Sequence, residues 1–184
     1  MGVWRFSLLG FPIVVEPWFW LIALLLGAQG PPELLPSWVI AVFVSVLAHE
    51  LGHAYLGRLY GMDASIRLYG MGGLTSYEGG SGLTLLRRAL LSLAGPMAGF
   101  ALALAVWVLM RLAPFEGRFV TDFLLDLVTV NVAWGLMNLL RVLPLDGGNV
   151  MRQGVYWWTG SRGDTLPLRI SLGTAALFAL PGLA

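Results

Sequence analysis

The segment Trp38–Tyr60, WVIAVFVSVLAHELGHAYLGRLY, decides how this chain folds. Residues 38–48 carry no charge, and the only two histidines of the chain, His49 and His53, follow with Glu50 between them. A helix over this segment is about 34 Å long, enough to cross a hydrocarbon core of about 30 Å. Histidines four residues apart lie on one face of a helix, one turn apart, where they can share a metal ion. The segment therefore predicts a metal-binding motif inside a membrane-spanning helix.

The composition of the whole chain favours an α-helical polytopic membrane protein in contact with a lipid bilayer. Of its 184 residues, 58% are hydrophobic and only 11% are charged, which is too apolar for the surface of a soluble domain. The absence of cysteine excludes disulfides and thiolate metal ligands. The net charge of +1, without a basic stripe, argues against nucleic acid as a partner.

Breaks in the apolar pattern predict about five transmembrane helices and two small β-hairpins within one membrane domain, residues 1–184. Proline and glycine interrupt helices, and a glycine-rich stretch between apolar runs indicates extended structure. The expected helices cover residues 18–27, 38–60, 85–112, 121–140 and 170–184, with 38–60, 85–112 and 121–140 as the core. The N-terminal segment 4–15 is expected to be a hairpin or an interfacial segment, and the second hairpin covers residues 61–77. Ser37 is the expected N-cap of the second helix. The last apolar segment is short for a span, so we expect the chain to be truncated there.

A third metal ligand is expected among the acidic residues downstream, because a catalytic zinc usually has three protein ligands and one open position. Asp146 lies in an apolar run, and the two glycines after it let the backbone approach another group closely. An uncompensated carboxylate near hydrocarbon is costly, and a metal ion would offset that cost. Asp122 and Asp126 are weaker candidates, since Asp near a helix start is commonly a cap or dipole partner. We expect one Zn²⁺ per chain, bound by His49, His53 and Asp146.

Glu50 can lie close to the metal without being a ligand, which suits the general base of metal-assisted peptide-bond hydrolysis. Two other interpretations stay open. The protein could be a metal-binding membrane protein or transporter without protease activity, or the motif could consist of buried polar groups satisfied by neighbouring helices. Transport predicts several metal sites along a path, yet the chain has no further histidine and no cysteine. Proteolysis within the membrane is therefore the leading hypothesis.

The arginines predict the orientation of the chain in the membrane. With a cytoplasmic N-terminus, the inner side holds Arg5, Arg58, Arg67, Arg87, Arg88 and Arg141, whereas the outer side holds Arg111 and Arg118. Cytoplasmic loops are enriched in basic residues, so this orientation is the favoured one. It brings the C-terminal ends of the second and fourth helices to one side, and places the metal site toward the cytoplasmic half of the bilayer.

At these residues the chain resembles the site-2 protease family of intramembrane zinc metalloproteases. Beyond the segment 49–53, residues 138–148 (Asn-Leu-Leu-Arg-Val-Leu-Pro-Leu-Asp-Gly-Gly) are similar to the family's second motif, in which the Asp is the third zinc ligand. The chain departs from the family at Arg141, where Pro is usual. Residues 92–96 (Ser-Leu-Ala-Gly-Pro) are similar to the family's third-helix signature, although Gly99 stands where Asn or Ser is common.

The resemblance implies further roles. Asn138 is similar to the family residue that helps to hold substrate or the developing oxyanion, and Asn131 lies on the same helix face. Interhelical hydrogen bonding is the alternative for both. The segment 61–77, with Gly72 and Gly73, resembles the family's membrane-associated hairpin, whose edge strand would pair with an unwound substrate. A hairpin that only plugs the helix bundle is the alternative.

The resemblance also implies a multi-pass protein of a prokaryotic cell membrane. The loops have no room for an inserted PDZ domain and no CBS domain is appended, so we expect a minimal member of the family. The expected partners are the bilayer and a membrane-anchored protein or peptide substrate, such as an anti-sigma factor, a pro-sigma factor or a leftover signal peptide.

Overall fold

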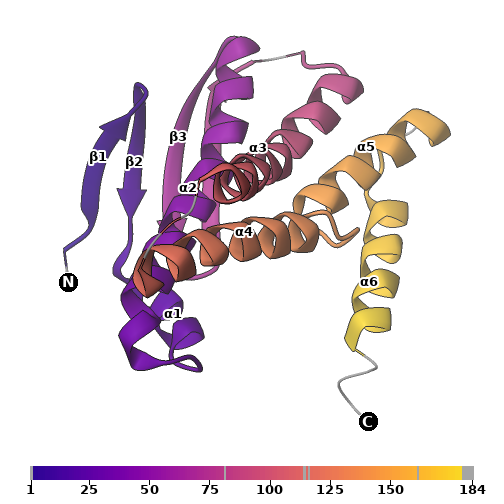
Figure 1. Cartoon of the computed structure of the whole chain (residues 1–184). Helices are drawn as coiled ribbons and strands as arrows, with labels where there is room; N and C mark the ends of the chain where they lie inside the picture. Colours follow the sequence, from indigo (N-terminus) through magenta and orange to yellow (C-terminus); the bar gives the residue numbers. More distant parts are fainter. Residues whose placement is uncertain (1, 81, 114, 116, 161, 180–184) are drawn as a thin grey trace.

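The computed structural model describes residues 2–80, 82–113, 115, 117–160 and 162–179. These residues form six α-helices, one short 3₁₀ helix and a four-stranded sheet. The sheet lies along one side of helix α2, and the other long helices pack on the remaining sides (Figure 1). The apolar segments of the sequence thus form helices, and the glycine-rich segments form strands and turns.

The sheet joins the two expected hairpins into one layer. Strands β1 (Trp4–Leu8) and β2 (Phe11–Val15) pair antiparallel, as do β3 (Met62–Tyr69) and β4 (Gly72–Gly79). Between the hairpins, β2 and β3 pair in parallel. Alternate residues of β2 and β3 are buried, because a strand places every second side chain on the same face. The strand order is β1-β2-β3-β4, so β4 lies at an edge of the sheet.

Helix α2 (Leu35–Leu59) carries the His-Glu-x-x-His motif and lies at the centre of the molecule. Helix α1 (Pro17–Gly27) and the 3₁₀ helix η1 (Pro32–Leu34) precede it, and η1 leads directly into α2. The prediction that Ser37 caps this helix was wrong. Ser37 lies inside the first turns, and its hydroxyl donates to the carbonyl oxygen of Leu34 at 2.8 Å. The helix starts earlier than expected because η1 continues into it and proline is tolerated in a first helical turn.

Helix α4 (Arg118–Asn138) runs beside α2 in the same direction. Three polar contacts follow one another along α4 and along η1 and α2: Glu33–Arg118 at 3.9 Å, Ser37–Asp126 at 3.2 Å and Ser45–Asn131 at 2.8 Å. Because the contacts advance in the same order on both helices, α2 and α4 run in the same general direction, and α4 ends near the histidines of α2 (Figure 1). This relative arrangement is the one that the arginine pattern predicts.

Helix α3 (Leu85–Leu112) has the bounds expected from the sequence and packs on both α2 and α4. Glycines allow these helices to approach closely, as is common in membranes. A Cβ at Gly52 would lie 2.5 Å from the carbonyl oxygen of Ala94, and one at Gly135 would lie 2.6 Å from the ring of Phe100.

Two shorter helices follow α4. Helix α5 (Asp146–Thr159) packs on α3, and α6 (Thr165–Ala179) packs on α5. The backbone N–H of Leu143 donates to the hydroxyl of Ser171 at 2.9 Å, which ties α6 to the connection before α5. Helix α6 begins earlier than expected, and residues 180–184 of the predicted last span lie outside the described residues.

Three helical segments are long and apolar enough to cross a membrane, namely residues 32–59, α3 and α4. Helices α1 and α6 are apolar but shorter. The chain is therefore an integral membrane protein with three clear candidate spans, and the count of five remains a prediction.

Candidate metal centre

The side chains of His49, His53 and Asp146 meet, although Asp146 is far from the histidines in sequence. The Oδ2 atom of Asp146 lies 3.1 Å from Nε2 of His49 and 3.3 Å from Nε2 of His53. The two Nε2 atoms are 3.2 Å apart. Helix α2 supplies both imidazoles, and the first residue of α5 supplies the carboxylate. Both histidines are buried.

These separations fit a single tetrahedral metal ion. Ligand atoms about 2.0 Å from such an ion lie about 3.3 Å from one another, in agreement with all three distances. Two imidazoles and one carboxylate, with a fourth position left open, form the donor set of a catalytic rather than a structural site. In the described part of the chain, this is the one group of such side chains arranged to hold a metal. Asp126, a weaker candidate from the sequence, instead accepts a hydrogen bond from Ser37.

His53 is held in the tautomer that a metal ligand needs. Its Nδ1–H donates to the carbonyl oxygen of Leu91 in α3 at 2.8 Å. Since a carbonyl can only accept, the neutral ring keeps its lone pair on Nε2, which points at the other two ligands. The Nδ1 atom of His49 is buried and has no hydrogen-bond partner among the described residues.

Gly95 of α3 leaves room for the metal ion. A Cβ at this position would contact Nε2 of His53 and lie 2.6 Å from Nε2 of His49. A methyl group there would fill the space between the ligand atoms. The site therefore depends on a glycine in a neighbouring helix, which the His-Glu-x-x-His motif does not reveal.

Two glycines bring Asp146 to the histidines. A Cβ at Gly147 would overlap the carbonyl group of Leu139, and one at Gly148 would lie 2.5 Å from the carbonyl oxygen of Val142. These neighbours are backbone atoms, so they cannot rotate away. The close approach that the sequence predicts at these glycines occurs inside the first turn of α5 rather than in a bend, and it fixes the start of α5 beside α2.

Glu50 lies on the wall of the same cavity, and strand β4 holds it. The hydroxyl of Thr75 donates to Oε2 of Glu50 at 2.7 Å and lies 3.1 Å from the main-chain oxygen of Glu50. Gly73 provides the space for the carboxylate, since a Cβ there would overlap the Glu50 side chain. The edge of the hairpin and the predicted base are therefore in direct contact.

A cavity of about 330 Å³ adjoins the metal site. Asn138 and Gly73, two of the four predicted substrate-binding residues, line this cavity. The side-chain amide of Asn138 donates one hydrogen bond to the carbonyl oxygen of Trp134 at 2.9 Å. Its second N–H and its oxygen have no hydrogen-bond partner among the described residues, so both can face a substrate.

The other two predicted substrate-binding residues lie away from this cavity. Asn131 is buried between α2 and α4, where its amide donates to Ser45 and to the carbonyl oxygen of Leu127. Gly72 lines an adjoining apolar pocket and allows the ring of Trp134 to lie against the strand.

Sequence reasoning missed Thr75 and Tyr77, both in β4. Burial raises the pKa of the Tyr77 phenol, and the negative charges of Glu50 and Asp146 raise it further. The Tyr77 hydroxyl places a hydrogen-bond donor at the cavity wall. The available signal was the alternation of the strand, because residues 73, 75 and 77 share one face.

Comparisons with known proteins agree with this site. Residues 37–123 match the model of peptidase family M50. Two relatives carry zinc-metalloprotease names: sll0528 of Synechocystis is 32% identical over 91% of this chain, and Rip3 of Mycobacterium tuberculosis is 36% identical over 90% of it. The chain spans 48% and 38% of the lengths of these two relatives.

The fold is similar to that of a solved site-2 protease. The structure of a site-2 protease from Methanocaldococcus jannaschii matches 99% of this chain and 85% of its own, with a TM-score of 0.72 at 24% identity. The family model, the named relatives and the shared fold agree with the motifs in the sequence, and together they make this chain similar to peptidase family M50 and to the site-2 protease fold.

Proposed function

We propose that this chain is a zinc endopeptidase that hydrolyses peptide bonds of membrane-anchored substrates within or near the bilayer. The observation that carries the proposal is the convergence of His49, His53 and Asp146 on one site, with Glu50 on the wall of the adjoining cavity. The names of the relatives support zinc as the metal, and the geometry supports one ion per chain.

Each group of the site has a separate role in the hydrolysis. Zinc, when bound, supplies a Lewis acid for the scissile carbonyl and lowers the pKa of water at the site to about 7. The carboxylate of Glu50 takes a proton from the attacking water and returns it to the departing amine. Thr75 holds that carboxylate in place through its hydroxyl. Asn138 donates its free amide N–H to the substrate carbonyl as negative charge develops on the oxygen.

The substrate enters as an extended strand beside β4. A peptide bond within a helix is shielded, so the substrate must unwind before it can be cut. Unwinding breaks the backbone hydrogen bonds of the substrate helix, and an edge strand supplies new hydrogen-bond partners for them. Strand β4 lies at the sheet edge, and its Gly73 and Thr75 contact Glu50. A peptide paired with β4 is therefore close to the predicted base.

The C-terminal end of α2, together with the β1–β2 turn whose Leu9 carbonyl accepts from Arg58, lies on the cytoplasmic side, so the site opens toward the cytoplasmic half of a prokaryotic cell membrane. The excess of arginines on this side supports the orientation. Membrane-anchored regulators, or leftover signal peptides cleaved near their cytoplasmic end, are the substrates that fit.

The variant Glu50→Gln tests the proposal. The purified wild-type protein is expected to hold one zinc ion and to cleave a synthetic single-span peptide. Glu50→Gln is expected to keep the zinc and to lose about 10²–10⁴-fold in cleavage rate, because only the general base is removed. The control His53→Ala should lose both zinc and cleavage. A wild-type protein that holds zinc but cleaves no such peptide would instead support a metal-binding membrane protein without protease activity.

A further inference from the structure

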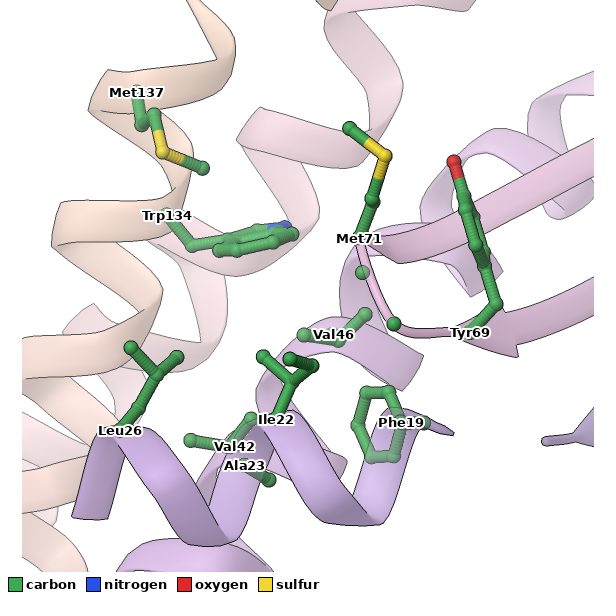
Figure 2. A pocket seen from close by; sticks show the side chains of 12 residues that line it. Phe19, Ile22, Ala23, Leu26, Val42, Val46, Tyr69, Met71, Trp134 and Met137 are labelled. Carbon is green, nitrogen blue, oxygen red and sulfur yellow. The ribbon is translucent and has the colours of Figure 1, made fainter. Parts of the chain in front are cut away.

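A second pocket of about 230 Å³ lies beside the metal cavity. Its wall comes from α1, α2, the turn between β3 and β4, and the last turns of α4 (Figure 2). Ile22 of α1 points toward Met71 of the turn and Trp134 of α4 across it, and Ala23 lines the pocket beside Val42 (Figure 2). Neither the motif nor the proposed catalytic residues account for this space.

The pocket shares part of its wall with the metal cavity. Four side chains line both spaces: Tyr69, Met71, Trp134 and Met137. The two spaces meet at the start of β4, where Gly72 lines the apolar pocket and the next residue, Gly73, lines the metal cavity. A strand advances about 3.3 Å per residue, so a peptide paired with β4 would have a side chain at the pocket within one or two residues of the bond near Glu50.

The chemistry of the wall determines what can occupy the pocket. None of the lining residues is ionisable at neutral pH, and the polar side-chain groups are the Tyr69 hydroxyl and the Trp134 indole N–H. A charged side chain would lose its hydration without gaining an opposite charge. An apolar cavity of about 150 Å³ already accommodates a benzene ring, so this pocket is large enough for a leucine or phenylalanine side chain.

We infer that this pocket is a specificity subsite, which takes an uncharged aliphatic or aromatic side chain of the substrate next to the scissile bond. The inference rests on the proposed proteolytic function and adds the side chain that the enzyme selects. Trp134 and Met71 separate the subsite from the metal cavity. Gly72 is needed because a Cβ there would lie 2.5 Å from the Trp134 ring.

Two variants of opposite effect test the subsite. Two single-span peptides are compared that differ only in one residue beside the mapped cut, which is Phe in one peptide and Ala in the other. For each enzyme, kcat/KM for the Phe peptide divided by kcat/KM for the Ala peptide gives the Phe-to-Ala ratio. Ala23→Leu fills the pocket and is expected to lower the Phe-to-Ala ratio by about 10–100-fold. Ile22→Ala enlarges the pocket and is expected to raise that ratio and to improve cleavage of a Trp peptide. A folding defect cannot shift the two ratios in opposite directions.

Ala28→Leu is the matched control, because Ala28 is exposed at the end of α1 and lies outside the pocket. It should leave the ratio and the zinc content unchanged. Wild-type protein that cleaves none of the peptides would refute the proposed function. Cleavage with the same ratio in Ala23→Leu, Ile22→Ala and wild type would refute the subsite alone.

A binding measurement provides a readout apart from activity. Glu50→Gln protein is irradiated with the uncleaved peptide carrying a benzophenone side chain at the selected position. The expected adducts are on Met71, Met137 or Trp134, and Ala23→Leu should reduce them. Adducts confined to the outer faces of α3 and α4 would overturn the subsite.

Discussion

At the scale of single residues, the contact between Thr75 and Glu50 links the hairpin to the chemistry. The Thr75 hydroxyl lies 2.7 Å from Oε2 of Glu50, whereas Glu50 itself belongs to α2. The predicted base therefore takes its orientation from the strand that would bind the substrate. A general base must lie within hydrogen-bond reach of its proton, so a residue that sets the direction of the carboxylate affects the rate without touching the substrate.

We expect Thr75→Val to lower kcat by about 10–100-fold through misplacement of the Glu50 carboxylate. KM and zinc content should stay close to wild type, because neither the ligands nor the edge strand changes. Thr75→Ser keeps the hydroxyl and should restore kcat. Steady-state cleavage of one single-span peptide by the three proteins measures this. A Thr75→Val protein that changes only KM, or a Thr75→Ser protein that is as slow as Thr75→Val, would contradict the positioning role.

The spacing of residues in the sequence and the polarity of their neighbours explain which parts of the site could be predicted. The histidine pair and Glu50 follow from helical periodicity, and Asp146 follows from its apolar surroundings. The structure brings these residues to one cavity. The contributions of Thr75 and Gly95 could not be predicted, because they depend on which strand and which helix pack against α2. The alternation of the strand places residue 75 on one face, and residues 92–96 resemble a family signature, but neither pattern names α2 as the packing partner.

At the scale of elements, the start of α5 sets the position of a metal ligand. Gly147 packs against the backbone of Leu139, and Asp146 is the preceding residue. We expect Gly147→Ala to push the start of α5 away and to weaken zinc binding by about 10–100-fold, the range seen when the support of a ligand is lost. Competition with a chelator of known affinity measures the change.

The control for this prediction lies in the same helix. A Cβ at Gly154 would meet nothing within 4 Å, so Gly154→Ala makes the same chemical change without the overlap. It should bind zinc as wild type does and should be slightly more stable, since alanine is favoured over glycine in a helix by about 1 kcal/mol. Equal zinc affinity in the two variants would show that the packing of Gly147 does not position Asp146.

Element boundaries and element pairing differ in how well the sequence predicts them. Helix α3 has the expected bounds, because a long apolar run follows Thr84, whose side chain caps the helix. The parallel pairing of β2 with β3 was not predicted, since α1 and α2 separate the two strands in sequence. Both strands show the alternation of a half-buried strand, but alternation does not name a partner.

At the scale of the whole molecule, the parallel course of α2 and α4 fixes which loops share a side of the membrane. The hairpin after α2 and the connection after α4 must lie together, because Asp146 reaches the histidines. Helix α3 leads from that side to the opposite one, so the connection around residue 115 lies across the bilayer from the hairpin. From the arginine distribution we predict which of these two sides is cytoplasmic.

Single-cysteine labelling tests this orientation, because the natural chain has no cysteine and every introduced thiol is therefore unique. In intact cells, a membrane-impermeant maleimide should label Phe115→Cys and should label Asp63→Cys only after the membrane is opened. Both positions are exposed in the structure, so a lack of reaction reflects the membrane and not burial. The reverse pattern would place the metal site in the outer half of the bilayer. Labelling of both positions in intact cells would mean that α3 does not cross the membrane, and the arginine argument would then fail together with the predicted side of the site.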